Sequence, residues 1–302
     1  MWEGLTILND PRVATELLSP VLACGTYRLP LDRPLVMGVL NVTPDSFSDG
    51  GRYLDAARAL ERAQQMLDDG ADLVDIGGES TRPGAAPTPE RDELERVIPL
   101  IGRLRAECDV RGVPMSVDTR KPAVMRAAID AGASMINDVS ALRAHGAVEA
   151  VAGSGVAVCL MHMQGEPPTM QQGVVYTDVV TEVKNFLKQR AEACRAAGIS
   201  RERIVVDPGF GFGKTVDHNL ILLSRLAEIV ALGYPVAVAL SRKSTIGAIT
   251  GREVDDRVAG SIAAALAAVA CGAAIVRAHD VRETVDALKV WRAATSGGLS
   301  RE

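Results

Sequence analysis

MRAAIDAGASMINDVS, residues 125–140, contains the unit that decides the fold: a helical run, then Gly-Ala, then a short apolar strand with a polar end. The same order returns at 55–80, in DAARALERAQQMLDDG followed by ADLVDIGGES, and at 264–280, in AALAAVACG followed by AAIVRAHD. In the first of these, small and apolar residues recur on one helical face, and Gly70 is a natural stop. The repetition indicates alternating βα units.

Eight runs along the chain fit the strand of this unit. They are VMGVLN (36–41), LVDIGGES (73–80), PMSVDT (114–119), MINDVS (135–140), VAVCLMHM (156–163), RIVVDPG (203–209), PVAVALSRK (235–243) and AIVRAHD (274–280). Such nearly continuous apolar runs suit a parallel sheet covered on both faces. They predict an α/β fold, a (β/α)8 TIM barrel. The alternative is a doubly wound open sheet, which usually has a glycine-rich first turn where this chain has NVTPDS.

A single domain is predicted, because α/β barrels reach 302 residues as one unit. The barrel is assigned to residues 34–295. Residues 1–33 are expected to form a short N-terminal extension that closes the barrel bottom, and residues 296–302 a C-terminal tail.

The bulk composition excludes several classes of partner. The net charge is −5 and no long basic run occurs, so no nucleic-acid partner is expected. The five cysteines are odd in number and form no CxxC pair, which indicates reduced thiols. The N-terminus lacks the features of a signal peptide. We therefore expect a cytoplasmic protein.

Residues 258–276, VAGSIAAALAAVACGAAIV, contain no charge and have the length of a membrane span. The run is rich in Ala and Gly, however, and Gly272 divides it. A buried helix followed by a buried strand fits better, so no membrane association is expected. A helix with such small side chains is also compatible with packing against a second subunit.

Polar residues recur where the predicted strands end. They are Asn41, residues 75–82, Asp118, Asn137, Asp138, His162, Asp207, residues 241–243, Arg277 and His279. One such residue would be an ordinary strand end or helix cap. When seven or eight strands supply them, a pocket at the C-terminal mouth of the barrel is the better interpretation.

Two chemical groupings follow. Asp118, Asn137, Asp207 and Lys243 combine donors and acceptors that suit a flat heterocycle, although Asp207 and Lys243 could instead form a structural ion pair. The second grouping suits phosphate groups and a metal ion, because a guanidinium binds phosphate oxygens and an Asn side-chain oxygen can bind Mg²⁺. It comprises Arg277, His279, Asn41 and Thr81.

FGFGKT (210–215) looks like a phosphate-binding loop, but Pro208 stands where a P-loop requires Gly. Its glycines are expected to let the backbone approach a flat ligand, with Phe212 as a wall.

The motifs together resemble the dihydropteroate synthase family. They run in order from residue 37 to 281 as MGVLNVTPDSFSDGG, DIGGESTRPGA, SVDTRKP, INDVSAL, LMHMQGEPPTMQ, DPGFGFGKT, LSRKSTIG and RAHDV. The resemblance implies a (β/α)8 barrel and a transferase that joins p-aminobenzoate to 6-hydroxymethyl-7,8-dihydropterin diphosphate with Mg²⁺ as cofactor. The products are 7,8-dihydropteroate and diphosphate, in folate biosynthesis.

The resemblance also implies roles for individual residues. The pterin pocket corresponds to Asp118, Asn137, Met161, Asp207 and Lys243. The diphosphate side corresponds to Asn41, Thr81, Arg277 and His279, with Asn41 as the metal ligand. The p-aminobenzoate subsite corresponds to Thr43, Pro44, Phe47, Arg82, Pro83, Phe212 and Ser244. Lys243, Asp207, Arg277 and His279 are the expected catalytic residues.

Sulfonamides are expected as competing inhibitors and a homodimer as the assembly, both from the resemblance. An SN1-like departure of diphosphate is the expected mechanism. Two alternatives remain at this point: a pterin-dependent methyltransferase and a non-catalytic pterin-binding paralogue.

Overall fold

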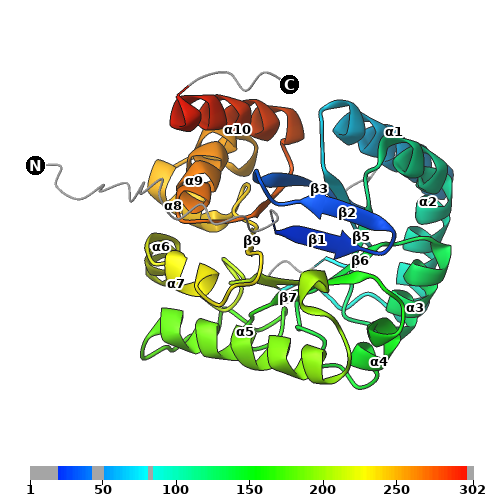
Figure 1. Cartoon of the computed structure of the whole chain (residues 1–302), viewed down its shortest axis with the longest axis horizontal. Helices are drawn as coiled ribbons and strands as arrows, with labels where there is room; N and C mark the ends of the chain where they lie inside the picture. Colours follow the sequence, from blue (N-terminus) through cyan, green and yellow to red (C-terminus); the bar gives the residue numbers. More distant parts are fainter. Residues whose placement is uncertain (1–19, 43–50, 81–83, 298–302) are drawn as a thin grey trace, which may run out of the picture.

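The computed structural model describes residues 20–42, 51–80 and 84–297, with side chains in the second range from residue 56. Within them, eight parallel strands form a barrel surrounded by helices (Figure 1). The barrel strands are β3 Leu35–Asn41, β4 Leu73–Gly77, β5 Met115–Asp118, β6 Met135–Asp138, β7 Ala157–Met161, β8 Ile204–Asp207, β9 Ala237–Val238 and β10 Ile275–Ala278. Seven of them lie inside predicted runs, and β3 begins one residue before its run, at Leu35.

The order of the strands closes the sheet. β3 to β8 pair in sequence order, and β10 lies between β3 and β9. The pairing of Arg277 with Met37 joins the last strand to the first, and an isolated parallel bridge from Val206 to Val236 joins β8 to the start of β9. The TIM-barrel prediction is therefore confirmed, and the open-sheet alternative is wrong.

Helices on the outside cover the apolar outer face of the barrel (Figure 1). In chain order they are α1 Gly51–Asp68, α2 Glu90–Arg111, α3 Pro122–Ala131, α4 Ala147–Ala152, α5 Val179–Ala196, α6 Val216–Ser224, α7 Ala227–Val230, α8 Ser244–Thr250, α9 Val258–Ala270 and α10 Val281–Ser296. The 258–276 run is divided between α9 and β10, as predicted. In the described part of the chain, no helix is long and apolar enough to cross a membrane.

A hairpin of β1 Val21–Cys24 and β2 Tyr27–Pro30 precedes the barrel. Leu22 and Cys24 are fully buried, in one cluster with the first inward-facing residues of the barrel strands, such as Leu35 and Leu73. Figure 1 shows the hairpin across one end of the barrel. Because these barrel residues begin their strands, the hairpin fills the N-terminal end of the cylinder.

Two predicted runs are longer than the strands they contain, because their polar ends lie beyond the strands. β9 covers only Ala237–Val238 of the run 235–243, and the chain then turns at Arg242, whose φ is 59°. β4 similarly ends at Gly77, before the polar residues Glu79 and Ser80. These polar ends are loops at the C-terminal mouth.

Candidate active site

The site residues continue the inward-facing positions of the strands. Alternate residues of a strand point to opposite faces, so a side chain two positions after an inward apolar residue also points inward. Met135 at the barrel bottom is followed in this way by Asn137, and Val205 by Asp207. The same parity puts Asn41, Asp75, Asp118, Met161, Arg277 and His279 at the C-terminal mouth. The barrel interior thus changes from apolar at one end to polar at the other.

Arg277 lies between two carboxylates inside the mouth. Its Nε donates to Asp75 Oδ2 at 2.6 Å, and its Nη2 donates to Asp118 Oδ2 at 3.0 Å. Asn137 Nδ2 donates to the same Asp75 oxygen at 3.0 Å. Asp75 is fully buried, and its Oδ1 has no hydrogen-bond partner in the structure. Asp75 therefore connects the arginine of one predicted grouping to the amide of the other.

The pKa values in this network follow from burial and close charges. Burial raises the pKa of Asp118 to about 7; the Arg277 cation opposes the rise and the Asp75 carboxylate adds to it. Burial lowers the pKa of Arg277, but Asp75 and Asp118 outweigh burial and raise it above its ordinary value. The arginine thus stays charged, while Asp118 titrates near neutrality.

Asp207 and Lys243 face the mouth from the other side of the barrel. Gly209 N–H donates to Asp207 Oδ1 at 2.7 Å; burial raises the pKa of Asp207, and the Lys243 cation opposes that rise. Lys243 Nζ donates to the carbonyl of Phe210 and lies 4.6 Å from the centre of the Phe212 ring. Burial lowers the pKa of Lys243 to about 8.

The predicted alternative role of Asp207 and Lys243 was a structural ion pair. Within the described residues no ion pair joins them: the lysine uses Phe210 O, and the aspartate uses Gly209 N. The two charges still shift each other's pKa, while each makes its hydrogen bond to the backbone.

His279 is held by Ser241. The Ser241 Oγ accepts the His279 backbone N–H at 3.2 Å and lies 3.0 Å from Nδ1 of the ring. Burial, with help from the Arg277 and Arg242 cations, lowers the pKa of His279 to about 4. The ring is neutral near pH 7, and a hydroxyl proton given to Nδ1 leaves Nε2–H as a donor.

Arg242 joins the loop after β9 to the loop after β10. It is a non-glycine residue with a φ of 59°, a conformation that costs energy unless the surroundings impose it. Its Nε and Nη2 donate to the two oxygens of Asp280 at 3.0 and 2.5 Å, and its backbone N–H donates to Ser261 Oγ at 2.9 Å. These contacts hold the flanking Ser241 and Lys243 in place.

The remaining described site residues line the apolar edge of the mouth. Met161 is buried in a small cluster with Val139 and Met170, and Phe212 packs against that cluster. Ser244 is exposed at the first position of α8. The predicted residues Thr43, Pro44, Phe47, Thr81, Arg82 and Pro83 lie outside the described residues.

Asn41 ends β3 at the mouth, where its Oδ1 lies 3.5 Å from the position that a Cβ on Gly77 would occupy. Among the described side chains, no group of three His, Cys, Asp or Glu could hold a metal ion. The single amide oxygen still fits Mg²⁺, which usually takes one or two protein ligands and completes its shell with water and substrate phosphates.

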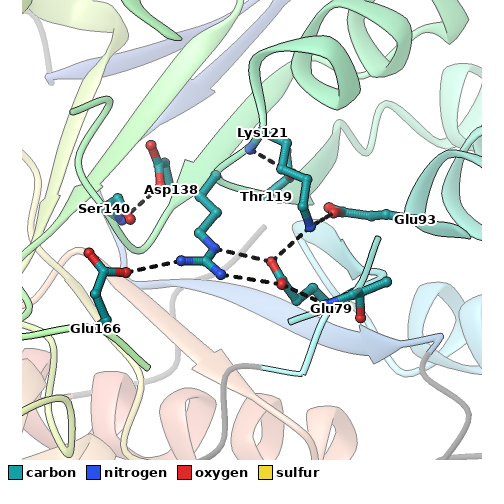
Figure 2. Close-up of polar contacts among 9 residues, drawn as sticks. Glu79, Glu93, Thr119, Lys121, Asp138, Ser140 and Glu166 are labelled. Carbon is teal, nitrogen blue, oxygen red and sulfur yellow. Dashed lines mark hydrogen bonds and ion pairs between the residues drawn. The ribbon is translucent and has the colours of Figure 1, made fainter. Parts of the chain in front are cut away.

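Two sets of charged contacts near the site were not predicted from the sequence, although Glu79 and His162 are among the polar residues expected at the mouth. In the first, Lys121 Nζ lies 2.5 Å from Glu93 and 3.1 Å from Glu79, and Arg120 bonds Glu79 and Glu166 (Figure 2). These residues come from the loops after β4, β5 and β7 and from α2. The charged residues that follow Gly77 and Asp118 indicate that charges gather at this mouth. Which of them pair depends on the fold.

The second is Lys214, inside the FGFGKT segment that fails the phosphate-loop pattern. It is 3% exposed and bonds His162 Nδ1 at 2.9 Å. No local pattern indicates that this lysine would be buried.

Comparisons with known proteins identify the family. The family described as "Pterin binding enzyme" matches residues 37–279. The dihydropteroate synthase of Neisseria meningitidis serogroup B is 51% identical over 280 residues, covering 90% of this chain and 97% of that protein.

Solved structures give the same result. Xanthomonas albilineans dihydropteroate synthase with 4-aminobenzoic acid has a TM-score of 0.87 and 53% identity, covering 92% of this chain and 99% of that one. Yersinia pestis dihydropteroate synthase with a sulfonamide drug complex has a TM-score of 0.86 and 48% identity, covering 91% and 99%. The chain is an enzyme, a transferase, and it belongs to the dihydropteroate synthase family of pterin-binding enzymes.

Proposed function

We propose that the polar mouth of this barrel joins p-aminobenzoate to 6-hydroxymethyl-7,8-dihydropterin diphosphate, giving 7,8-dihydropteroate and diphosphate. The observation that carries the proposal is the buried network of Asp75, Arg277, Asp118 and Asn137, with Asp207 and Lys243 facing the same mouth. Family membership supports the reaction class.

The pterin is assigned to the deep side of the mouth. Asp118, Asn137 and Asp207 offer carboxylate and amide groups to the ring nitrogens and amino group, while Lys243 offers an ammonium to the carbonyl oxygen. All three of the first group are nearly buried, so their hydrogen bonds to a ligand form with little competition from water. Met161 supplies an apolar contact for the ring.

The diphosphate is assigned to the side of β3 and β10. Arg277 and the Nε2–H of His279 are the protein donors, and Asn41 Oδ1 would hold Mg²⁺. When bound, Mg²⁺ would neutralise charge on the leaving diphosphate without proton transfer. Thr81 belongs to this group through the resemblance.

The reaction replaces one bond at the pterin CH₂. The C–O bond breaks and its electron pair leaves with diphosphate; the amine lone pair of p-aminobenzoate then forms the C–N bond. The nitrogen loses a proton after attack, so no strong general base is required. Asp118 and Asp207, whose carboxylates flank the deep side, stabilise the positive charge that develops on the ring during an SN1-like departure.

The p-aminobenzoate subsite is assigned to the outer edge of the mouth. Phe212 and Ser244 lie there, and Thr43, Pro44, Phe47, Arg82 and Pro83 are assigned to it by the resemblance. Sulfonamides are expected to compete at this subsite, as supported by the Yersinia pestis relative's complex.

The pH dependence of catalysis should report Lys243. Its pKa of about 8 means that the ammonium is present below that pH and is lost above it. We expect kcat/KM for the dihydropterin diphosphate to fall about tenfold per pH unit above pH 8. Lys243→Arg should lower the rate but abolish this basic limb, since arginine stays charged. A limb that is unchanged in that variant would assign it to another group.

Asn41→Ala should weaken binding of the diphosphate substrate and raise the Mg²⁺ concentration for half-maximal rate by about tenfold, the effect of losing one bond to a charged group. Calorimetry with the dihydropterin diphosphate, with and without Mg²⁺, gives a readout independent of turnover. Asn41→Asp keeps an oxygen at this position and is the matched control. Unchanged Mg²⁺ dependence in the alanine variant would remove Asn41 from the metal site.

The decisive test of the function is diphosphate release from the dihydropterin diphosphate, measured with and without p-aminobenzoate. Release that depends on p-aminobenzoate supports the proposal. Pterin binding without turnover would favour a non-catalytic paralogue, and transfer of a methyl group would favour the methyltransferase. A homodimer in the cytoplasm, with small molecules as its only ligands, remains part of the proposal; sedimentation tests the assembly.

A further inference from the structure

We propose that Lys214 is a positioning residue. It holds one side of the 209–213 loop through hydrogen bonds, and the opposite side of that loop keeps Lys243 in the pterin pocket. The inference rests on the proposed function for the role of Lys243, but its contacts are independent of that role. Lys214 is buried and is not among the residues assigned to either substrate.

The surroundings of Lys214 Nζ consist almost entirely of acceptors. It donates to Gly209 O at 2.9 Å, Phe212 O at 3.0 Å and His162 O at 3.3 Å, and lies 2.9 Å from His162 Nδ1. Carbonyl oxygens accept only, so a protonated amine, with three donors, matches this site best. Burial lowers the pKa of Lys214 well below its usual value, and the Asp207 carboxylate opposes that effect.

The loop cannot obtain its shape from its own side chains. Gly209, Gly211 and Gly213 have φ values of 69°, 82° and 58°, a region that favours glycine. A Cβ on Gly209 would lie 1.9 Å from His162 O, and one on Gly213 would lie 2.4 Å from Gln164 O. The loop thus packs backbone against backbone on the segment after β7, and its inward carbonyls need the donors of Lys214.

The opposite side of the same loop contacts Lys243. Phe210 O accepts from Lys243 Nζ, and the Phe212 ring lies 4.6 Å below it. A Cβ on Gly211 would lie 3.3 Å from Lys243 Cδ. Gly209 N–H, at the start of the loop, donates to Asp207 Oδ1. A shift of the loop therefore moves both the ammonium and the carboxylate of the pterin pocket.

His162 is itself held in place, and it bonds Lys214. Its ring contacts Phe186 edge to face, with centroids 4.9 Å apart, and burial lowers its pKa to about 2, so the ring is neutral. The Nδ1 atom of a neutral ring can accept a hydrogen bond from Lys214 Nζ. Tyr176 OH donates to Gly213 O at 2.9 Å and holds the far end of the loop. Among the described side chains, the titratable groups that contact the loop or Lys214 are His162, Tyr176, Lys214, Lys243 and Asp207.

The test compares Lys214→Met with Lys188→Met in the full-length protein. Methionine has similar length and apolar stem but no donor; Lys188 is an exposed α5 lysine and controls for removal of one lysine. We measure the melting temperature, kcat and KM for both substrates, and the pH profile of kcat/KM. A misplaced Lys243 should lower kcat/KM for the dihydropterin diphosphate about 10- to 100-fold.

A purely structural lysine would lower only the melting temperature. Positioning predicts in addition that the basic limb set by Lys243 moves from about 8 toward the ordinary lysine value, because water reaches a looser pocket. A folded Lys214→Met protein with kcat/KM within twofold of wild type and an unmoved limb overturns the proposal.

If Lys214→Met does not fold, His162→Phe takes its place, since it keeps a ring against Phe186 and removes one acceptor of Lys214. The same shift of the limb supports positioning, and an unmoved limb contradicts it. Wild-type protein without turnover would reject the proposed function instead. In that case calorimetric binding of the pterin, compared between wild type and Lys214→Met, still decides the positioning role: equal affinities reject it and a weakened affinity supports it.

Discussion

Arg277→Ala should lower kcat/KM by about 30- to 1,000-fold, which corresponds to a loss of about 2–4 kcal/mol of transition-state stabilisation. The variant removes the donor assigned to the leaving diphosphate. It also leaves the buried carboxylates of Asp75 and Asp118 without the cation that lies 2.6 and 3.0 Å from them. Steady-state kinetics with both substrates, with a melting curve beside it, measures the two effects separately.

Arg277→Lys is the matched control. It keeps the charge but loses the planar fork that reaches both carboxylates at once, so we expect an intermediate rate. Wild-type turnover of the alanine variant at saturating substrate would remove Arg277 from the catalytic residues.

Lys121→Met should lower the free energy of unfolding by about 3–5 kcal/mol, the usual cost of leaving a buried charge without its partner. Glu93 is fully buried, its Oε1 has no partner in the structure, and its Oε2 lies 2.5 Å from Lys121 Nζ (Figure 2). Removal of the lysine therefore strands a carboxylate inside the protein. Denaturant unfolding with a two-state fit measures the change.

Two further variants sharpen this test. Lys121→Met combined with Glu93→Leu removes both charges and should recover most of the lost stability, because no unpaired group remains. Lys188→Met breaks an exposed pair with Glu192 and should change stability by less than about 0.5 kcal/mol. A Lys121→Met protein as stable as the Lys188→Met protein would contradict the role given to the buried pair.

The barrel was predictable because its local signals agree. Each strand is an apolar run with a polar end, and that polar end marks the mouth. Because the N-terminal end of the barrel is apolar, Met135 of β6 and Val205 of β8 are expected to point inward. Asn137 and Asp207, two residues later, then point inward as well. The polar residues converge because parallel strands end on the same side.

The pairing of side chains could not be predicted in the same way. Arg277 was expected on the diphosphate side, near Asp75 by the resemblance, yet its Nη2 also donates to Asp118, which lies 159 residues away. The burial of Lys214 depends on the segment after β7, 52 residues earlier. Such contacts follow from strand register and loop shape, and neither is encoded in a local pattern.

The β1–β2 hairpin has a kinetic consequence. Because the hairpin fills the N-terminal end of the cylinder, we expect ligands to enter and leave at the C-terminal mouth. In the proposed site, the buried Asn137 and Asp207 lie deeper than the half-buried Phe212 and the exposed Ser244. We therefore expect the pterin substrate to bind before p-aminobenzoate, and the coupled product to leave before the next pterin substrate binds.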